Sequence, residues 1–94
     1  MELKFKGSFF RDLDAIDNRY LLLSVSKKIA EIKSAKSASH ISRLKRFKAY
    51  KRTWHKIEIR SEHNQKIYWI LCIIRKNIIE LRRIKSETYF KKNY

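Results

Sequence analysis

The chain has no proline, one glycine and one cysteine among its 94 residues. With Gly7 as the only glycine, few tight turns can be placed from the sequence. Cys72 stands alone in an apolar run, which excludes an internal disulfide and a cysteine-based metal cluster. We therefore predict that Cys72 is a small buried hydrophobic residue and not a nucleophile.

Long apolar runs are also missing. No stretch approaches the roughly 18 apolar residues that a membrane-spanning helix needs, and Met1 to Phe10 do not resemble a secretory signal. These absences predict a cytoplasmic protein without a membrane partner. The chain is long enough for one small core, and 44% hydrophobic residues is too many for a disordered basic tail. Residues 1–94 are therefore expected to form a single domain.

Acidic residues are scarce: 9 Asp and Glu stand against 24 Lys and Arg, for a formal net charge of +15. Such a surface repels itself, and binding to phosphates or to an acidic protein relieves that repulsion. A lysine-rich compositional bias, as in an AT-rich genome, would explain part of the excess. The remainder predicts a polyanionic partner, with RNA favoured.

The first half of the chain reads as a strand followed by two helices. Residues 1–6 alternate apolar and polar residues until Gly7, and Ser8 is placed to cap a helix that starts at Phe9. After a break near Asp17 and Asn18, apolar residues recur at helical spacing up to Ile32. This second helix is expected to end within residues 34–39.

The second half changes to a strand period. In residues 54–60, alternate side chains are apolar and charged, and residues 66–74 are apolar on both faces, as in a central strand. Residues 78–84 return as a third strand of a meander, and residues 85–94 read as a polar, aromatic tail. The order predicts an α+β fold with two N-terminal helices packed on a small, mainly antiparallel sheet.

The charged face of the strand 54–60 is the first candidate site. In-line attack by a 2′-hydroxyl on RNA needs a base, cations for the developing charge and an acid for the leaving oxygen. Glu58 fits the base, the neighbouring Lys and Arg side chains fit the cations, and Tyr89 or a protonated lysine fits the acid. A solvated basic face that only binds phosphates explains the same pattern, so catalysis does not follow from spacing alone.

The histidines give little support for a metal site. His40, His55 and His63 are not at metal-ligand spacing, and no paired carboxylates accompany them, so we expect no metal. His55 falls on the apolar face of its strand, as a hydrogen-bonded core histidine would. His63 lies in a polar turn and is freer to act.

Several aromatic residues could stack on RNA bases, although aromatic side chains in a sheet more often belong to the core. Only Trp54 and Tyr89 accompany the charged face. The basic residues expected to bind RNA around it are Lys45, Arg46, Arg52, Arg60, Arg82 and Arg83.

These pieces resemble the RelE/ParE superfamily of toxins from bacterial toxin–antitoxin pairs, over nearly the whole chain. Ser8 to Asp17 (S-F-F-R-D-L-D-A-I-D) is similar to the family's first-helix segment. Arg43 to Tyr50 (R-L-K-R-F-K-A-Y) resembles the segment before its sheet, K-I-E-I-R and K-I-Y-W-I resemble its strand pair, and Lys85 to Tyr89 resembles its C-terminal Arg-x-x-x-Tyr.

The resemblance implies a toxin held inactive by a cognate antitoxin. In the RelE-like branch it also implies metal-independent cleavage of mRNA on the ribosome, with no small-molecule cofactor. By position, Lys56, Lys66, Lys85 and Tyr89 match that branch's catalytic residues. Glu58 replaces a second lysine, and Glu62 with His63 is loosely similar to the Glu and His of the YoeB relatives.

Two other functions stay open. The ParE-like branch shares the fold and inhibits DNA gyrase without cutting RNA, and arginines of the RelE pattern are lysines here at two matched positions. Lysine lacks the bidentate fork that arginine offers a phosphate. A plain nucleic-acid-binding domain is the second alternative.

Overall fold

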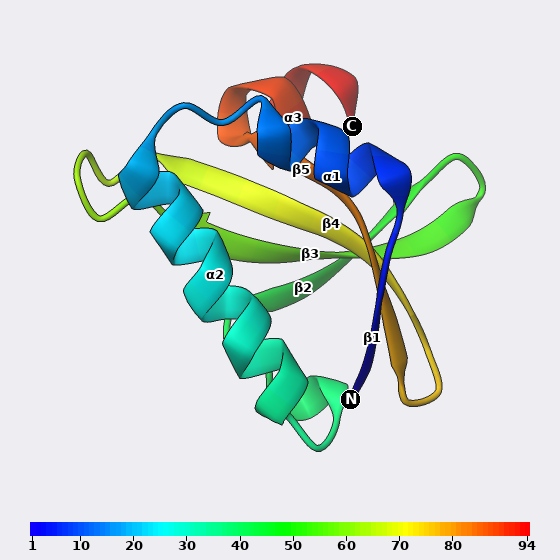
Figure 1. Cartoon of the computed structure of the whole chain (residues 1–94). Helices are drawn as coiled ribbons and strands as arrows, with labels where there is room; N and C mark the ends of the chain where they lie inside the picture. The colour runs from blue at the N-terminus through cyan, green and yellow to red at the C-terminus, as the bar shows by residue number, and fades with distance from the viewer.

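The computed structural model describes all residues, 1–94, and contains a five-stranded sheet and three α-helices (Figure 1). In chain order the elements are β1 (Glu2–Phe5), α1 (Gly7–Asp14), α2 (Arg19–Ser34), a short 3-10 helix (Ala38–His40), β2 (Leu44–Ala49), β3 (Arg52–Arg60), β4 (Ile67–Arg75), β5 (Ile78–Ser86) and α3 (Glu87–Asn93).

The strands lie in the order β1-β5-β4-β3-β2. Strands β2 to β5 form an antiparallel meander, and β1 joins the free edge of β5 in parallel. The predicted α+β fold with a mainly antiparallel sheet is therefore confirmed. Parallel pairing requires a long connection, which α1, α2 and the later strands provide between β1 and β5.

The core lies between the sheet and the two N-terminal helices. Helix α1 packs against β5, and α2 runs obliquely over the sheet and packs against β3 (Figure 1). The residues buried between them include Phe9, Leu21, Val25, Ile32, Ile57, Ile70, Cys72, Ile79 and Leu81. Cys72 is fully buried, as the sequence predicted, and burial raises the pKa of its thiol to about 12.

Of the two predicted helix starts, that of α2 is confirmed and the N-cap of α1 is not. The break before the second helix is confirmed, because the Asn18 side chain accepts hydrogen bonds from the backbone N–H of Tyr20 and Leu21. The cap predicted at Ser8 is wrong. Lys6 occupies the N-cap position of α1, and the Ser8 hydroxyl donates to the Arg82 carbonyl at 2.7 Å, which ties α1 to β5. None of the helices combines the length and apolarity needed to cross a membrane.

Strand β4 is buried on both faces, as its apolar sequence predicted. Ile70 and Cys72 point into the core under α1 and α2, while Trp69 and Leu71 are buried on the opposite face. Part of the cover on that face is α3, which falls within the stretch expected to be a polar tail. Ser86 caps this helix by accepting from the Tyr89 N–H at 3.1 Å, and Glu87 stands in its first turn.

Strand β2 was also missed. It is an edge strand whose basic residues fall on both faces, so its sequence has no clean alternation of apolar and polar residues.

Five residues other than glycine have positive φ, a consequence of the scarcity of glycine: Arg43, Tyr50, Lys51, Gln65 and Lys76. Ala49 pairs with Arg52 across β2 and β3, so Tyr50 and Lys51 form a two-residue hairpin turn with φ of 52° and 59°. This turn normally takes Asn-Gly, because side chains other than glycine are strained there. The turn therefore stores strain.

Replacing Lys51 with glycine is expected to raise the free energy of unfolding by about 0.5–1 kcal/mol, since glycine relieves the left-handed strain at the expense of some chain entropy. Urea unfolding would measure the change. Lys48→Gly, in the neighbouring strand where φ is not positive, serves as the control and should lower stability by a similar amount. If Lys51→Gly and Lys48→Gly changed the free energy of unfolding equally, the backbone at Lys51 would not be strained.

Candidate nucleic-acid interface

The sheet face turned away from the core carries a row of cations. Strand β3 places Lys56, Glu58 and Arg60 on this face, and Lys45 of β2 lies opposite Lys56. Strand β5 lies on the other side of β4 from β3. Its residues Arg83 and Lys85 pair with Leu71 and Trp69 of β4. We call this surface the basic face; its residues are Lys45, Lys56, Glu58, Arg60, Trp69, Arg82, Arg83 and Lys85.

A β-bulge brings two arginines to this surface. The β4–β5 register shifts between Leu71 and Cys72, so that Leu81 and Ile84 both reach the core. The residues between them, Arg82 and Arg83, are left out of the core, and both form ion pairs with carboxylates: Arg82 with Glu80, and Arg83 with Asp12. The extra residue of a bulge re-aims side chains in this way.

Lys56 occupies the centre of the basic face. Its Nζ lies 4.2 Å from the centre of the Trp69 ring and 4.0 Å from that of Phe90 in α3, so two aromatic rings hold the ammonium group. Burial lowers the pKa of Lys56 below its ordinary value; Glu87 opposes this shift and Lys45 adds to it. A lowered pKa raises the share of the neutral amine, which is the form of lysine that can accept a proton.

Lys85 and Tyr89 are neighbours at the start of α3. The Lys85 Nζ lies 4.5 Å from the centre of the Tyr89 ring and 3.4 Å from Asp12 Oδ1. Asp12 also accepts hydrogen bonds from Arg83 and from the Ile84 backbone N–H. Three of the four residues matched to the RelE pattern, Lys56, Lys85 and Tyr89, thus lie where α3 meets the sheet.

Glu58 is not a free carboxylate. It is 8% exposed, and its Oε2 accepts from Arg43 at 2.8 Å and from Arg60 at 2.9 Å. The hydrogen bond from Arg60 leads the causes that lower the pKa of Glu58; burial opposes them, and the charges of both arginines support them. This environment keeps Glu58 ionised and weakly basic, which argues against the role of general base.

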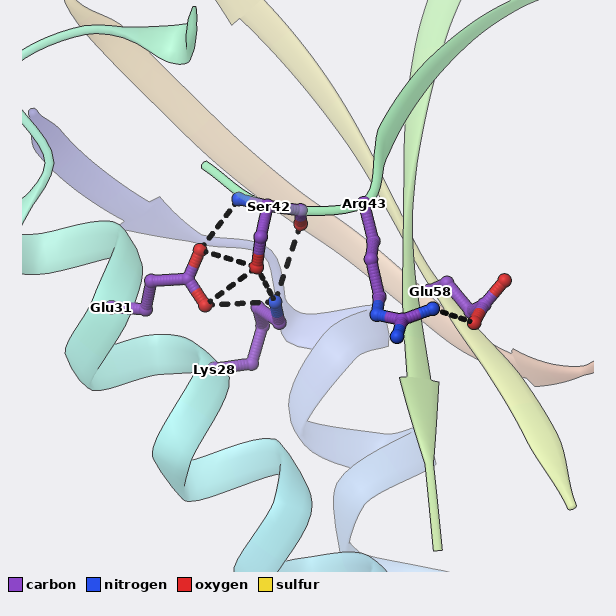
Figure 2. A network of polar contacts seen from close by, with 5 residues as sticks. All are labelled: Lys28, Glu31, Ser42, Arg43 and Glu58. Carbon is purple, nitrogen blue, oxygen red and sulfur yellow. Dashed lines mark hydrogen bonds and ion pairs between the residues drawn. The ribbon is translucent and has the colours of Figure 1, made fainter. Parts of the chain in front are cut away.

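Figure 2 shows how the Arg43–Glu58 pair is joined to a second polar network. Lys28 of α2 donates to Glu31 at 2.8 Å and to the hydroxyl of Ser42 at 3.0 Å, and Glu31 in turn accepts from the Ser42 backbone N–H. This network holds the start of β2 against α2. The adjoining cleft, of about 280 Å³, is lined by both charge signs, so its cations are largely compensated.

The other candidates lie elsewhere. His63 stacks on Tyr20, with ring centres 4.9 Å apart, beside the start of α2. Lys66 is exposed just before β4 and lines a separate cleft of about 400 Å³ together with Glu87, the first residue of α3. Arg46 projects from the opposite face of the sheet, beside His55. The roles of these residues stay predictions.

His55 departs from its expected environment. Its Nδ1 is buried without a hydrogen-bond partner, so the prediction of a hydrogen-bonded core histidine is wrong at this atom. Burial lowers the pKa of His55, and the nearby Arg46 charge lowers it further. No group of three or more His, Cys, Asp or Glu side chains is arranged to hold a metal ion.

The β2–β3 hairpin adds Phe47 and Tyr50, which were missed as candidates, to Trp54, which the sequence placed beside the charged face. The Trp54 indole N–H donates to the Ala49 carbonyl at 3.2 Å, which fixes the ring. The guanidinium carbons of Arg52 and Arg82 lie 5.8 Å and 5.7 Å from the centre of this ring. The sequence does contain a signal for a basic surface at this hairpin, because no acidic residue occurs between Glu31 and Glu58.

No family sequence profile and no curated protein sequence matches the chain. Among solved structures, that of a copper-bound mutant toxin from Helicobacter pylori is similar, with a TM-score of 0.50 and 15% sequence identity. The likeness covers 95% of this chain and 97% of the other. The chain has the fold of that toxin. At this level of identity the likeness shows the fold alone, and membership of the RelE/ParE superfamily stays a prediction.

Proposed function

We propose that this protein is the toxin of a toxin–antitoxin pair, and that it binds mRNA on the ribosome through the basic face and cleaves it without a metal ion. The observation that carries the proposal is the place of Lys56, which is partly buried between the Trp69 and Phe90 rings at the centre of the basic face. The fold shared with a toxin supports the toxin role alone, and the cleavage of mRNA rests on the basic face.

The proposed reaction is an in-line attack of the RNA 2′-hydroxyl on the adjacent phosphorus. Neutral Lys56 takes the hydroxyl proton, the new O2′–P bond forms, and Lys85 stabilises the charge on the phosphorane oxygens, since the single carboxylate of Asp12 cannot neutralise both Arg83 and Lys85. The P–O5′ bond then breaks, and the Tyr89 hydroxyl donates its proton to the leaving oxygen. The products are a 2′,3′-cyclic phosphate and a 5′-hydroxyl end.

Helix α3 partly closes this site, because Phe90 lies over Lys56. No residue of α3 is itself fully buried, but the helix covers Trp69, which is 3% exposed, so its displacement uncovers apolar surface that bound RNA has to cover in its place. RNA therefore reaches Lys56 when α3 shifts. An acidic cognate antitoxin would compete for the same surface, by charge complementarity with the chain's net charge of +15.

One observation favours the gyrase-directed alternative. The candidate residues for RNA cleavage are not all together: His63 and Lys66 lie away from Lys56, and Glu58 is ion-paired. A toxin that acts by binding a protein needs none of them.

The test is induced expression without antitoxin, with growth followed and new mRNA 5′ ends mapped. The wild type is expected to arrest growth and cut mRNA, while Lys56→Ala and Tyr89→Phe should each lower the cleavage rate at least about hundredfold. Lys36→Ala, at an exposed lysine just after α2, is the matched control and should stay toxic. Growth arrest with intact mRNA and damaged DNA would instead establish the gyrase inhibitor, and no arrest would leave a non-catalytic binding domain.

A further inference from the structure

The end of the β2–β3 hairpin presents aromatic rings and cations together. We call this the hairpin tip and define it by Phe47, Tyr50, Arg52, Trp54, Arg82 and Tyr94. Tyr50 is 72% exposed, the highest value among the large hydrophobic residues with substantial exposure, and Tyr94 is 38% exposed. An exposed aromatic group of this kind usually marks a binding surface.

The rings of the hairpin tip form a connected series. The Phe47 and Trp54 rings are nearly parallel, at 23°, with centres 6.3 Å apart. Tyr94 meets both Phe47 and Tyr50 edge-on, with centres 5.9 Å apart in each case. Because Tyr94 meets the Tyr50 ring edge-on, a ligand that stacks on Tyr50 needs little further ordering of that side chain.

The cations of the hairpin tip suit a chain that carries both bases and phosphates. Arg52 and Arg82 both lie beside the Trp54 ring, and the planar guanidinium group can stack while its N–H groups bind phosphate. The turn adds Lys51, and the only acidic group here is Glu80, which is paired with Arg82. Acidic peptides would use the charge but would leave the exposed Tyr50 ring unused.

The hairpin tip is continuous with the basic face. The Lys56 Nζ lies 5.9 Å from the centre of the Phe47 ring, and Phe47 contacts Phe90 with ring centres 5.1 Å apart. A strand bound near Lys56 can therefore continue onto the hairpin tip. The strained turn at Tyr50 and Lys51 is consistent with selection for the side chains it presents.

We propose that the hairpin tip binds unpaired bases of single-stranded RNA by stacking on the exposed Tyr50 ring, with Arg52 and Arg82, which lie over Trp54, on the flanking phosphates. Stacking of this kind needs bases that are free of a duplex, and it tolerates any base identity. The inference rests on the RNA-directed function proposed above, and it adds a second contact that holds the strand without taking part in its cleavage.

The experiment compares two labelled strands of about ten nucleotides, one an ordinary single-stranded RNA and one with the same ribose phosphates but no bases. Fluorescence anisotropy with the full chain is expected to show the base-bearing strand bound at least about tenfold more tightly. Tyr50→Ala should remove most of this difference and leave binding of the abasic strand unchanged. Because Tyr50 is on the surface, the substitution should leave the fold intact.

Tyr20→Ala is the matched control, since Tyr20 is also exposed and stacked but belongs to α2. It should bind both strands as the wild type does. Equal binding of the two strands by the wild type, or an unchanged difference in Tyr50→Ala, would overturn the hairpin-tip proposal and leave the RNA-directed function standing. Binding of neither strand would overturn both. A single-stranded DNA of the same length is titrated alongside, and tighter binding of that strand would overturn the assignment to RNA.

Discussion

Replacing Asp12 with alanine is expected to lower the free energy of unfolding by about 2–3 kcal/mol. The Asp12 carboxylate accepts hydrogen bonds from Arg83 and from the Ile84 backbone N–H and lies 3.4 Å from the Lys85 ammonium. Its loss leaves a partly buried donor unpaired and two cations without their counter-charge, and both effects are costly. Urea unfolding at neutral pH would measure the change.

The same carboxylate makes stability depend on pH. Burial opposes ionisation of Asp12, but the hydrogen bonds and charges of its partners outweigh it, and the pKa falls below the ordinary 3.8. Asp12 therefore contributes its full stabilisation at pH values above its ordinary pKa of 3.8. This contribution is lost as the pH falls through the lower pKa that Asp12 has in the folded state. The stability difference between the wild type and Asp12→Asn should shrink over that acid range.

Asp14→Ala provides the control for both measurements. Asp14 lies on the same helix but is exposed and forms no ion pair, so its replacement should change stability by less than about 0.5 kcal/mol. If Asp12→Ala were as mild as Asp14→Ala, the Asp12 network would not anchor α1 to β5.

The affinity for single-stranded RNA is expected to fall by roughly two to three orders of magnitude between 50 and 200 mM salt, as it would for about six phosphate contacts on a single strand. The physical cause is the release of counterions when the basic face binds phosphates. Anisotropy titrations across this salt range would give the slope of log affinity against log salt.

Two adjacent residues of β2 locate the contact. Lys45 lies on the basic face and Arg46 on the opposite face. Lys45→Ala should reduce the salt slope by about 0.7, the value for one phosphate contact on a single strand, whereas Arg46→Ala should leave it unchanged. If Arg46→Ala reduced the salt slope and Lys45→Ala did not, the RNA would lie on the other face of the sheet, against the proposal.

Some features could be predicted because they depend on local pattern or on composition. The alternation of residues 54–60 assigns Lys56 and Ile57 to opposite faces of β3, and the structure agrees. The unbroken apolar run of β4 predicts a strand covered on both sides. The helix α3 could have been predicted too, since Ser86 followed by an acidic first turn is a capping signal.

Other features were not visible in the local pattern. An edge strand such as β2 needs no apolar alternation, so its sequence resembles a loop. The turn at Tyr50 and Lys51 lacks glycine and gives no turn signal, because pairing of the flanking strands forces the left-handed backbone.

The sequence by itself determined the excess of positive charge, the buried lone cysteine and the face of β3 on which Lys56 lies. Only the tertiary structure decided which cations remain uncompensated, because the neutralising contacts join residues distant in the chain: Asp12 with Arg83, and Arg43 with Glu58. It also decided that α3 folds back over Lys56. Charge and periodicity are set by neighbours along the chain, whereas burial, ion pairing and the pKa of each group depend on the elements that packing brings alongside it.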